Sequence, residues 1–126
     1  FKVGDNLPTV HESTSVGDAL VAARPAPNKR RAGAILLVDD NNKLVGIFTD
    51  GDLRRLVIDD KEPMIREIGK VATSNPRRLL TSALVRDAKQ LFTEHRVDEI
   101  PVVDEVNHPV GLIDVQDLIA LKVVAE

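Results

Sequence analysis

A chain of 126 residues with 43% hydrophobic and 29% charged side chains is long enough to bury a core and has the composition of a globular domain. Its net charge of −3 and its lack of Trp and Tyr argue against a nucleic-acid partner, which would need a basic field or a stacking platform. Its apolar stretches are far shorter than the ~20 residues of a membrane-spanning helix, so no membrane partner is expected. The absence of Cys excludes disulfides and thiol chemistry and fits the cytoplasm.

The first half of the chain predicts a helix, a pair of strands and a closing helix. A hydroxyl residue among residues 13–15 can cap a helix over 16–23. Short β-branched runs predict strands over 35–38 and 44–48, and residues 51–57 open the next helix.

A basic insertion interrupts this half. From Asp18 to Ala32 the chain covers 32 − 18 = 14 positions, whereas the matching span from Asp87 to Val97 covers 97 − 87 = 10. The extra residues fall within 24–31, where two prolines end the helix. We weigh two interpretations: a tolerated surface loop, or a flap whose Lys29, Arg30 and Arg31 reach toward an anionic ligand.

The second half predicts the same order of elements. Val85, Ala88, Leu91 and Phe92 share one face of an amphipathic helix over 85–95. Strands are expected over 100–103 and 110–113, with a turn between them and a final helix from Asp117. With a strand that starts near Thr9–Val10 in the first half and near Arg77–Arg78 in the second, each half is a β-α-β-β-α unit.

The two halves also repeat each other in sequence. The segment Val45–Leu53 (VGIFTDGDL) returns as Val110–Leu118 (VGLIDVQDL), a spacing of 110 − 45 = 65. Apolar runs ending in Asp39 and Asp104 precede the two copies at the same spacing, 104 − 39 = 65. Two copies imply two similar facing sites, which favours a binding module over a single catalytic centre.

The first copy carries groups suited to a phosphorylated sugar. Thr49 stands where a strand passes into a helix, so its hydroxyl and the helix amides favour a phosphate. Asp52 can accept two hydroxyl hydrogen bonds from a ribose, and a glycine such as Gly46 lets a ligand approach the backbone. A ligand-free alternative is a capping box in which Thr49 is the N-cap and Asp52 the third helical residue. Both interpretations stay open.

The repeated motif resembles that of tandem CBS domains, which reads Gly, two apolar residues, Thr or Ser, two variable residues, then Asp. Gly46, Thr49 and Asp52 match it in the first copy. The resemblance implies an α/β fold of two CBS units stacked about a pseudo-twofold axis, a Bateman module. The first unit, with an N-terminal linker, would cover residues 1–65 and the second residues 66–126.

The second copy departs from the motif. Gly111 and Asp117 match, but Asp114 replaces the hydroxyl residue. Its carboxylate would repel a phosphate at about 4 Å by about 1 kcal/mol even in water. The second site would then stay empty, or Asp114 and Asp117 would hold sugar hydroxyls or a Mg²⁺ through waters.

The resemblance also implies which residues contact a nucleotide, with the base held between aliphatic side chains. Thr49 and Asp52 would take phosphate and ribose in the first cleft. The strand residues against the base would be Ile35, Leu36 and Ile47 in the first cleft and Ile100, Pro101 and Val102 beside Asp117 in the second. Further contacts with the nucleotide would come from the strand starts at Thr9–Val10 and Arg77–Arg78.

A closer likeness lies in residues 46–55 (GIFTDGDLRR), which are very similar to the first CBS unit of arabinose-5-phosphate isomerases. These enzymes convert D-arabinose 5-phosphate to D-ribulose 5-phosphate on the way to the lipopolysaccharide sugar Kdo. The likeness implies that the chain, which starts at Phe1 without Met, is the regulatory fragment of a parent with a sugar isomerase domain. An adenine nucleotide or CMP-Kdo would be the regulatory ligand, and a homodimer, or a tetrameric parent, the assembly.

Two rival interpretations remain: a ligand-free dimerisation module, and the CBS pair of another enzyme. Catalysis within the chain itself is not expected. His11, His95 and His108 share no spacing that would build a metal site or place a base beside a nucleophile. The acidic pairs at 39–40 and 59–60 fall in turn and helix-end contexts and are interpreted as solvated.

Overall fold

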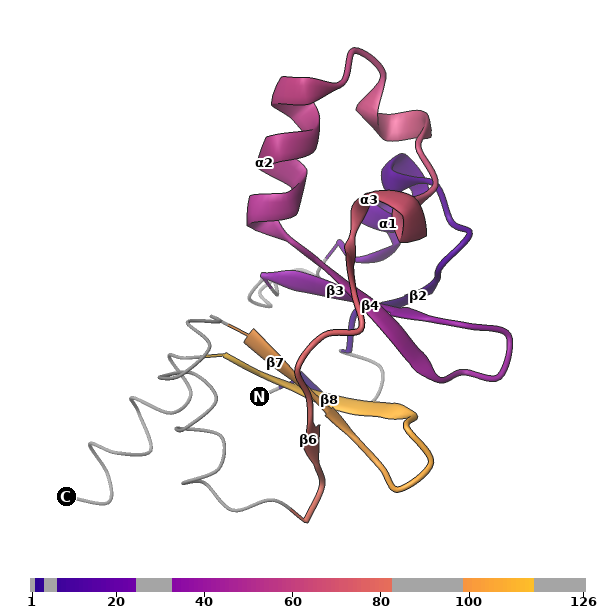
Figure 1. The fold of residues 1–126 in the computed structure, drawn as a ribbon, viewed down its shortest axis with the longest axis vertical. Helices are drawn as coiled ribbons and strands as arrows, with labels where there is room; N and C mark the ends of the chain where they lie inside the picture. The colour runs from indigo at the N-terminus through magenta and orange to yellow at the C-terminus, as the bar shows by residue number, and fades with distance from the viewer. Residues whose placement is uncertain (1, 4–6, 25–32, 83–98, 115–126) are drawn as a thin grey trace, which may run out of the picture. The chain divides into compact units, whose positions relative to one another are not determined.

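The computed structural model describes residues 2–3, 7–24, 33–82 and 99–114 (Figure 1). The chain divides into two compact units, one made of residues 8–76 and the other of residues 1–7 with 77–126. Within the described residues, no helix is long and apolar enough to cross a membrane.

The unit of residues 8–76 is built on a four-stranded sheet in the order β2-β3-β4-β5. These strands are β2 (Thr9–His11), β3 (Ala34–Val38), β4 (Leu44–Thr49) and β5 (Thr73–Ser74). β2 runs parallel to β3, and the other neighbours are antiparallel. The strands predicted over 35–38 and 44–48 are confirmed, each one residue longer.

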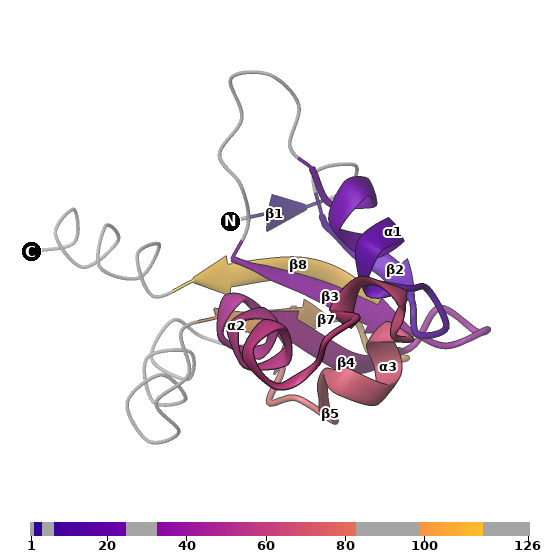
Figure 2. The ribbon, with the colours of Figure 1, turned by 90° about the horizontal axis from the view of Figure 1, so that it is seen from above.

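The helices of this unit cover one face of its sheet (Figure 2). They are α1 (Val16–Ala22), α2 (Asp50–Asp59), the 3₁₀ helix η2 (Pro63–Ile65) and α3 (Ile68–Val71). The core between helices and sheet consists of Val16, Ala19, Ile35, Leu37, Phe48 and Ile68. Each fully buried large side chain contributes about 1.5–3 kcal/mol of hydrophobic stabilisation.

Side-chain caps fix where α1 and α2 begin. Ser15 is the cap of α1, since its hydroxyl accepts a hydrogen bond from the Asp18 amide at 3.1 Å. α2 begins after Thr49 and ends at Asp59, and its C-cap residue Asp60 has an extended conformation. The expected hydroxyl cap among residues 13–15 is therefore confirmed.

Residues 66–69 are fastened to the start of α1. The Val16 amide donates to the Arg66 carbonyl at 2.8 Å, and the Ile68 amide donates to the Thr14 carbonyl at 2.8 Å. Gly69 passes so close to Glu12 that a Cβ at Gly69 would lie 2.8 Å from the Glu12 carbonyl oxygen. The compact unit thus extends to residue 76, whereas the boundary expected from the repeat lies at 65/66.

The other unit contains a second four-stranded sheet, in the order β1-β8-β7-β6. Its strands are β1 (Lys2–Val3), β6 (Leu79–Leu80), β7 (Glu99–Val103) and β8 (Pro109–Asp114). β6 is parallel to β7, which pairs antiparallel with β8, as β2, β3 and β4 do in the other unit. The α/β class is confirmed, while the helices expected over 85–95 and from Asp117 lie outside the described residues.

Candidate ligand-binding site

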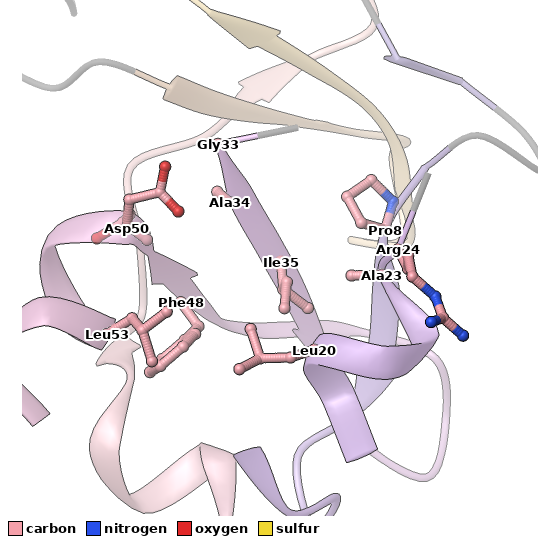
Figure 3. A pocket seen from close by; sticks show the side chains of 11 residues that line it. Pro8, Leu20, Ala23, Arg24, Gly33, Ala34, Ile35, Phe48, Asp50 and Leu53 are labelled. Carbon is pink, nitrogen blue, oxygen red and sulfur yellow. The ribbon is translucent and has the colours of Figure 1, made fainter. Parts of the chain in front are cut away.

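A pocket of about 260 Å³ lies within the unit of residues 8–76, where α1 ends, β3 begins and β4 passes into α2 (Figure 3). Its lining is Pro8, Leu20, Ala23, Arg24, Gly33, Ala34, Ile35, Phe48, Thr49, Asp50 and Leu53. Most of these side chains are apolar, and a few polar groups stand at the strand and helix ends. That combination is typical of small-molecule sites.

The junction between β4 and α2 is a complete capping box. The Thr49 hydroxyl accepts a hydrogen bond from the Asp52 amide at 3.1 Å, and the Asp52 carboxylate accepts one from the Thr49 amide at 3.0 Å. The capping interpretation of this pair is therefore confirmed. Because Thr49 also lines the pocket, capping and ligand contact do not exclude each other.

The Asp52 carboxylate is held inside the protein. Asp52 is 7% exposed, and Arg55 donates to its Oδ1. The Thr73 hydroxyl lies 3.4 Å from both carboxylate oxygens, so α2 is also tied to β5. Asp52 does not line the pocket, whereas Asp50, at the first position of α2, does.

The structure brings some of the predicted site residues of the first copy together. Ile35 and Thr49 line the pocket, but Gly46 and Ile47 do not. Ile47 is next to Phe48 on β4 and therefore points to the opposite face of the sheet. A Cβ at Gly46 would lie 3.2 Å from Leu37 Cδ1 and from the Thr73 carbonyl oxygen, so this glycine permits close packing.

In the second copy, Ile100, Pro101 and Val102 are buried within β7. Asp114 is the last residue of β8, and Asp117 lies outside the described residues. The proposed basic flap of residues 29–31 lies outside them as well.

Sequence reasoning missed several lining residues. Leu20 comes from α1 and Ala23 is the C-cap residue of that helix. Phe48 is the residue before Thr49, and Asp50 and Leu53 belong to α2. Phe48 and Asp50 flank Thr49 within the motif, and Leu20 lies one turn after the buried Val16. A pattern search that extended to these neighbours would have found them.

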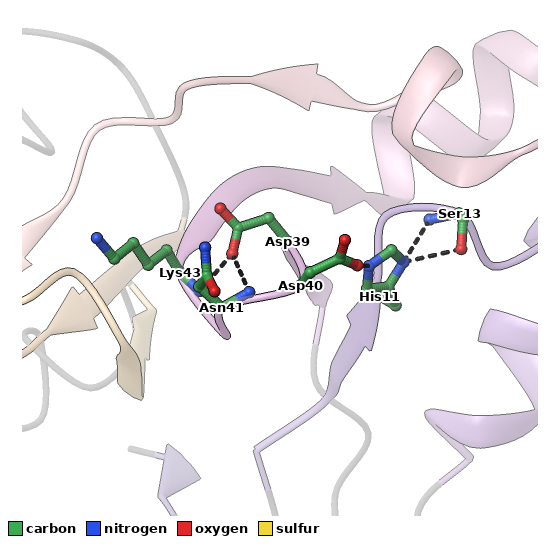
Figure 4. A network of polar contacts seen from close by, with 6 residues as sticks. All are labelled: His11, Ser13, Asp39, Asp40, Asn41 and Lys43. Carbon is green, nitrogen blue, oxygen red and sulfur yellow. Dashed lines mark hydrogen bonds and ion pairs between the residues drawn. The ribbon is translucent and has the colours of Figure 1, made fainter.

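His11 takes part in a polar cluster outside this pocket (Figure 4). Its Nε2 lies 2.6 Å from Asp40 Oδ1, and its Nδ1 lies 2.8 Å from the Ser13 hydroxyl oxygen. The Ser13 amide also donates to Nδ1, at 3.1 Å, so the ring fastens β2 to the β3–β4 turn. Asp40 is 93% exposed, as expected of a solvated carboxylate.

The other acidic and histidine candidates also have local partners. The Asp60 carboxylate accepts two hydrogen bonds from the Arg66 guanidinium, the shorter one at 2.7 Å, and these bonds lower the pKa of Asp60. His108 lies 3.3 Å from Asp104, and His95 lies outside the described residues. Within the described part of the chain, no group of three or more His, Asp or Glu side chains could hold a metal ion.

A family comparison decides the identity of this fold. The model of the CBS domain matches the chain twice, over residues 3–59 and 65–123. The chain belongs to the CBS domain family. The tandem arrangement expected from the repeat is therefore confirmed, and the pocket lies in the first CBS unit.

Relatives of this CBS pair include full-length enzymes. It is 32% identical over 119 residues to arabinose 5-phosphate isomerase KdsD of Pseudomonas aeruginosa, covering 93% of this chain and 35% of that protein. It is also 32% identical over 123 residues to the uncharacterised protein RP505 of Rickettsia prowazekii, covering 98% of this chain and 36% of that protein. The chain thus spans about a third of the length of these relatives.

Solved structures include the same architecture with a nucleotide bound. The crystal structure of CBSX2 in complex with AMP matches with a TM-score of 0.78 and 26% identity. The match covers 98% of this chain and 92% of the CBSX2 chain.

Proposed function

We propose that this CBS pair binds a nucleotide in the pocket of its first unit and passes the occupancy to a catalytic domain in the same parent chain. The observation that carries the proposal is the pocket itself, whose lining combines mostly apolar side chains with the polar groups of Thr49, Asp50 and Arg24. Aliphatic side chains can enclose a base, and the polar groups can meet ribose and phosphate. The AMP complex of CBSX2 supports a nucleotide as the ligand.

The residues proposed for nucleotide contact combine the motif with the pocket. The motif assigns contacts to Ile35, Gly46, Ile47, Thr49 and Asp52 in the first unit and to Ile100, Pro101, Val102, Asp114 and Asp117 in the second. Of the first set, Ile35 and Thr49 line the pocket, and we propose these two with the rest of the lining as the nucleotide contacts. An adenine nucleotide and CMP-Kdo are the candidate ligands, since both offer a ribose and a phosphate.

The parent is proposed to be a cytoplasmic arabinose-5-phosphate isomerase, which converts D-arabinose 5-phosphate to D-ribulose 5-phosphate for the synthesis of Kdo. The similarity to KdsD supports this assignment. The nucleotide would act by favouring one arrangement of the parent over another, which requires unequal affinity for the two.

A ligand-free dimerisation module is the second candidate. Apolar side chains stand exposed on the helices of the first unit: Val21 is 62% exposed, Ile58 75% and Ile65 67%. This candidate requires that these side chains form one contiguous apolar patch, which is what marks a protein-contact surface. In this case the pocket would play no part in regulation.

A matched pair of variants tests nucleotide binding. Ala23 lines the pocket, whereas its neighbour Ala22 is exposed and does not. The thermal stability of the chain is measured with AMP, ATP, CMP, CMP-Kdo and arabinose 5-phosphate. A ligand at 100 times its dissociation constant adds about 2.7 kcal/mol of stability. Ala23→Leu should abolish the shift and Ala22→Leu should keep it.

If none of these ligands raises the melting temperature of the unmodified chain, the proposal is contradicted and the dimerisation module is favoured. The regulatory part is tested in the full-length parent. There the active nucleotide should change isomerase kinetics, and Ala23→Leu should remove that response while the activity without nucleotide is retained.

A further inference from the structure

The segment that leads from the first unit into the second is short and anchored. Residues 75–78 follow β5, an edge strand of the first unit, and continue directly into β6 of the second. The Asn75 amide donates to the Val45 carbonyl on β4 at 3.1 Å. Pro76 is buried, and its ring fixes its φ. Such a segment has little freedom to absorb a displacement at one of its ends.

At the first unit, Thr73 of β5 connects this segment to the start of α2. Its hydroxyl lies 3.4 Å from both carboxylate oxygens of the buried Asp52 and donates to them. The same carboxylate accepts the Thr49 amide at 3.0 Å, and Thr49 lines the pocket. Asp52 therefore connects a pocket residue to β5 through hydrogen bonds on both sides.

At the second unit, Arg78 holds the other end of the segment. Its Nη1 donates to the side-chain oxygen of Asn107 at 2.6 Å. The Asn107 amide donates to the Asp104 carbonyl at 3.1 Å, so this residue belongs to the hydrogen bonding of the β7–β8 turn. A displacement of Arg78 would therefore act on that turn.

The start of α2 is better placed than the sheet to respond to a ligand. β3 is buried along its whole length, whereas Asp52 is the buried residue of α2. A largely exposed helix shifts more readily than a buried central strand. A ligand beside Thr49 can therefore move the Asp52 carboxylate, which is the acceptor of the Thr73 hydroxyl.

We propose that residues 73–78 transmit the occupancy of the first-unit pocket to the second unit. Thr73 receives the signal through Asp52, and Arg78 passes it to the β7–β8 turn through Asn107. This inference rests on the proposed nucleotide binding and names the route by which the two units are coupled. A nucleotide that favours one position of the α2 start would thereby favour one state of the turn.

NMR spectra of the isotope-labelled 126-residue chain with AMP test this route. In the unmodified chain, AMP should shift the amide peaks of residues that line the pocket and those of the β7–β8 turn and β8. Ala23→Leu blocks the pocket and should abolish both sets of shifts. Second-unit shifts that remain in Ala23→Leu would show that AMP binds there directly, and they would overturn the inference.

Thr73→Val removes the hydroxyl and keeps the β-branched shape. It should change AMP affinity by less than about twofold, while the second-unit shifts fall to less than about half. Ser74→Ala is the matched control, because it removes the neighbouring exposed hydroxyl, which points to the opposite face of the strand. Ser74→Ala should keep both the affinity and the shifts.

A second pair of variants tests the other end of the segment. Asn107→Gly removes the acceptor of Arg78 and still allows the positive φ at this position. The AMP-induced shifts of β8 should fall in this variant, with AMP affinity retained. Asn42→Gly makes the same change at the positive-φ residue of the β3–β4 turn and should leave the shifts intact.

The outcomes separate this inference from nucleotide binding itself. If AMP binds and the second-unit shifts persist in either Thr73→Val or Asn107→Gly, the inference is overturned and nucleotide binding stands. The same conclusion follows if AMP shifts the pocket peaks alone in the unmodified chain. If neither AMP, ATP, CMP nor CMP-Kdo shifts any peak of the unmodified chain, nucleotide binding fails and this inference fails with it.

Discussion

The turn between β3 and β4 and the turn between β7 and β8 are built in the same way. Asp39 Oδ1 accepts two backbone amides of its turn, at 2.8 and 3.0 Å, and Asp104 Oδ1 accepts two at 3.0 and 2.9 Å. Asn42 and Asn107, 107 − 42 = 65 positions apart, both have positive φ, of 60° and 66°. Asn tolerates this left-handed conformation better than most residues.

The positions that line the pocket in the first unit are not repeated in this way. Before the insertion the two copies are offset by 87 − 18 = 69 positions, so the sequence counterparts of Leu20 and Ala23 are Lys89 and Phe92. After the insertion the offset is 65, so the counterparts of Phe48 and Thr49 are Ile113 and Asp114. The two copies therefore share the turns that each sheet needs and differ where the first unit would meet a ligand. We expect the first unit to be the one that binds nucleotide.

Matched core positions should show the largest effects. Ile35 and Ile100 occupy equivalent central strands, but Ile35 borders the pocket and is 6% exposed, whereas Ile100 is fully buried. Ile-to-Ala substitutions in cores cost about 2–5 kcal/mol. Ile100→Ala should lie near the top of this range and Ile35→Ala near the bottom in urea unfolding. Equal losses of unfolding free energy in the two variants would show that Ile35 is packed as fully as Ile100 although it borders the pocket.

Asp52→Ala should destabilise the first unit by about 1–3 kcal/mol, because it removes the capping acceptor and leaves Arg55 and Thr73 without this partner. Thermal unfolding without ligand measures the loss. This loss must be known before Asp52→Ala is used in a binding assay. A smaller ligand-induced shift in this variant could come from lower stability as well as from lower affinity. A variant as stable as the unmodified chain would contradict the structural role of Asp52.

Most of the scaffold could be predicted from the sequence because its signals are local. The β-branched runs predicted β3 and β4 to within one residue, and the Thr49–Asp52 spacing predicted the capping box. β1 could not be found this way, since two residues carry no periodicity and their partner, β8, lies about 110 positions away in sequence.

The site was harder to predict than the scaffold. The motif pointed to Asp52, yet Asp50 lines the pocket, because the first turn of α2 directs these two side chains to different sides. Leu20 of α1 and the C-cap residue Ala23 reach the pocket through the way this helix packs on β3 and β4, which no local pattern in the sequence specifies.

Thr49→Asp should make the first motif like the second while preserving the helix start. Asp is as good an N-cap as Thr, so stability should change by only a few tenths of a kcal/mol, whereas Thr49→Val should cost about 1 kcal/mol. A new carboxylate about 4 Å from a phosphate costs about 1 kcal/mol in water, so AMP affinity should fall about fivefold in Thr49→Asp and adenosine affinity should not. Unchanged AMP affinity would place the phosphate far from this junction.

The smallest effects should come from the two equivalent turns at low pH. The hydrogen bond from the Lys43 amide lowers the pKa of Asp39 below 3.8, and that from the His108 amide lowers the pKa of Asp104 in the same way. A carboxyl whose folded pKa is lowered stabilises the fold fully above its unfolded value near 3.8, and this stabilisation is lost as pH falls through the folded value.

Asp39→Asn and Asp104→Asn should therefore lower the melting temperature at pH 7 and reduce its dependence on pH below 3.8 by similar small amounts. Asp40→Asn is the control, since Asp40 accepts no bond from a turn amide and its contact is with the ring of His11. Because both carboxylates receive the same pair of backbone bonds, a clear difference between the two variants would show that the turns support their sheets unequally despite their common geometry.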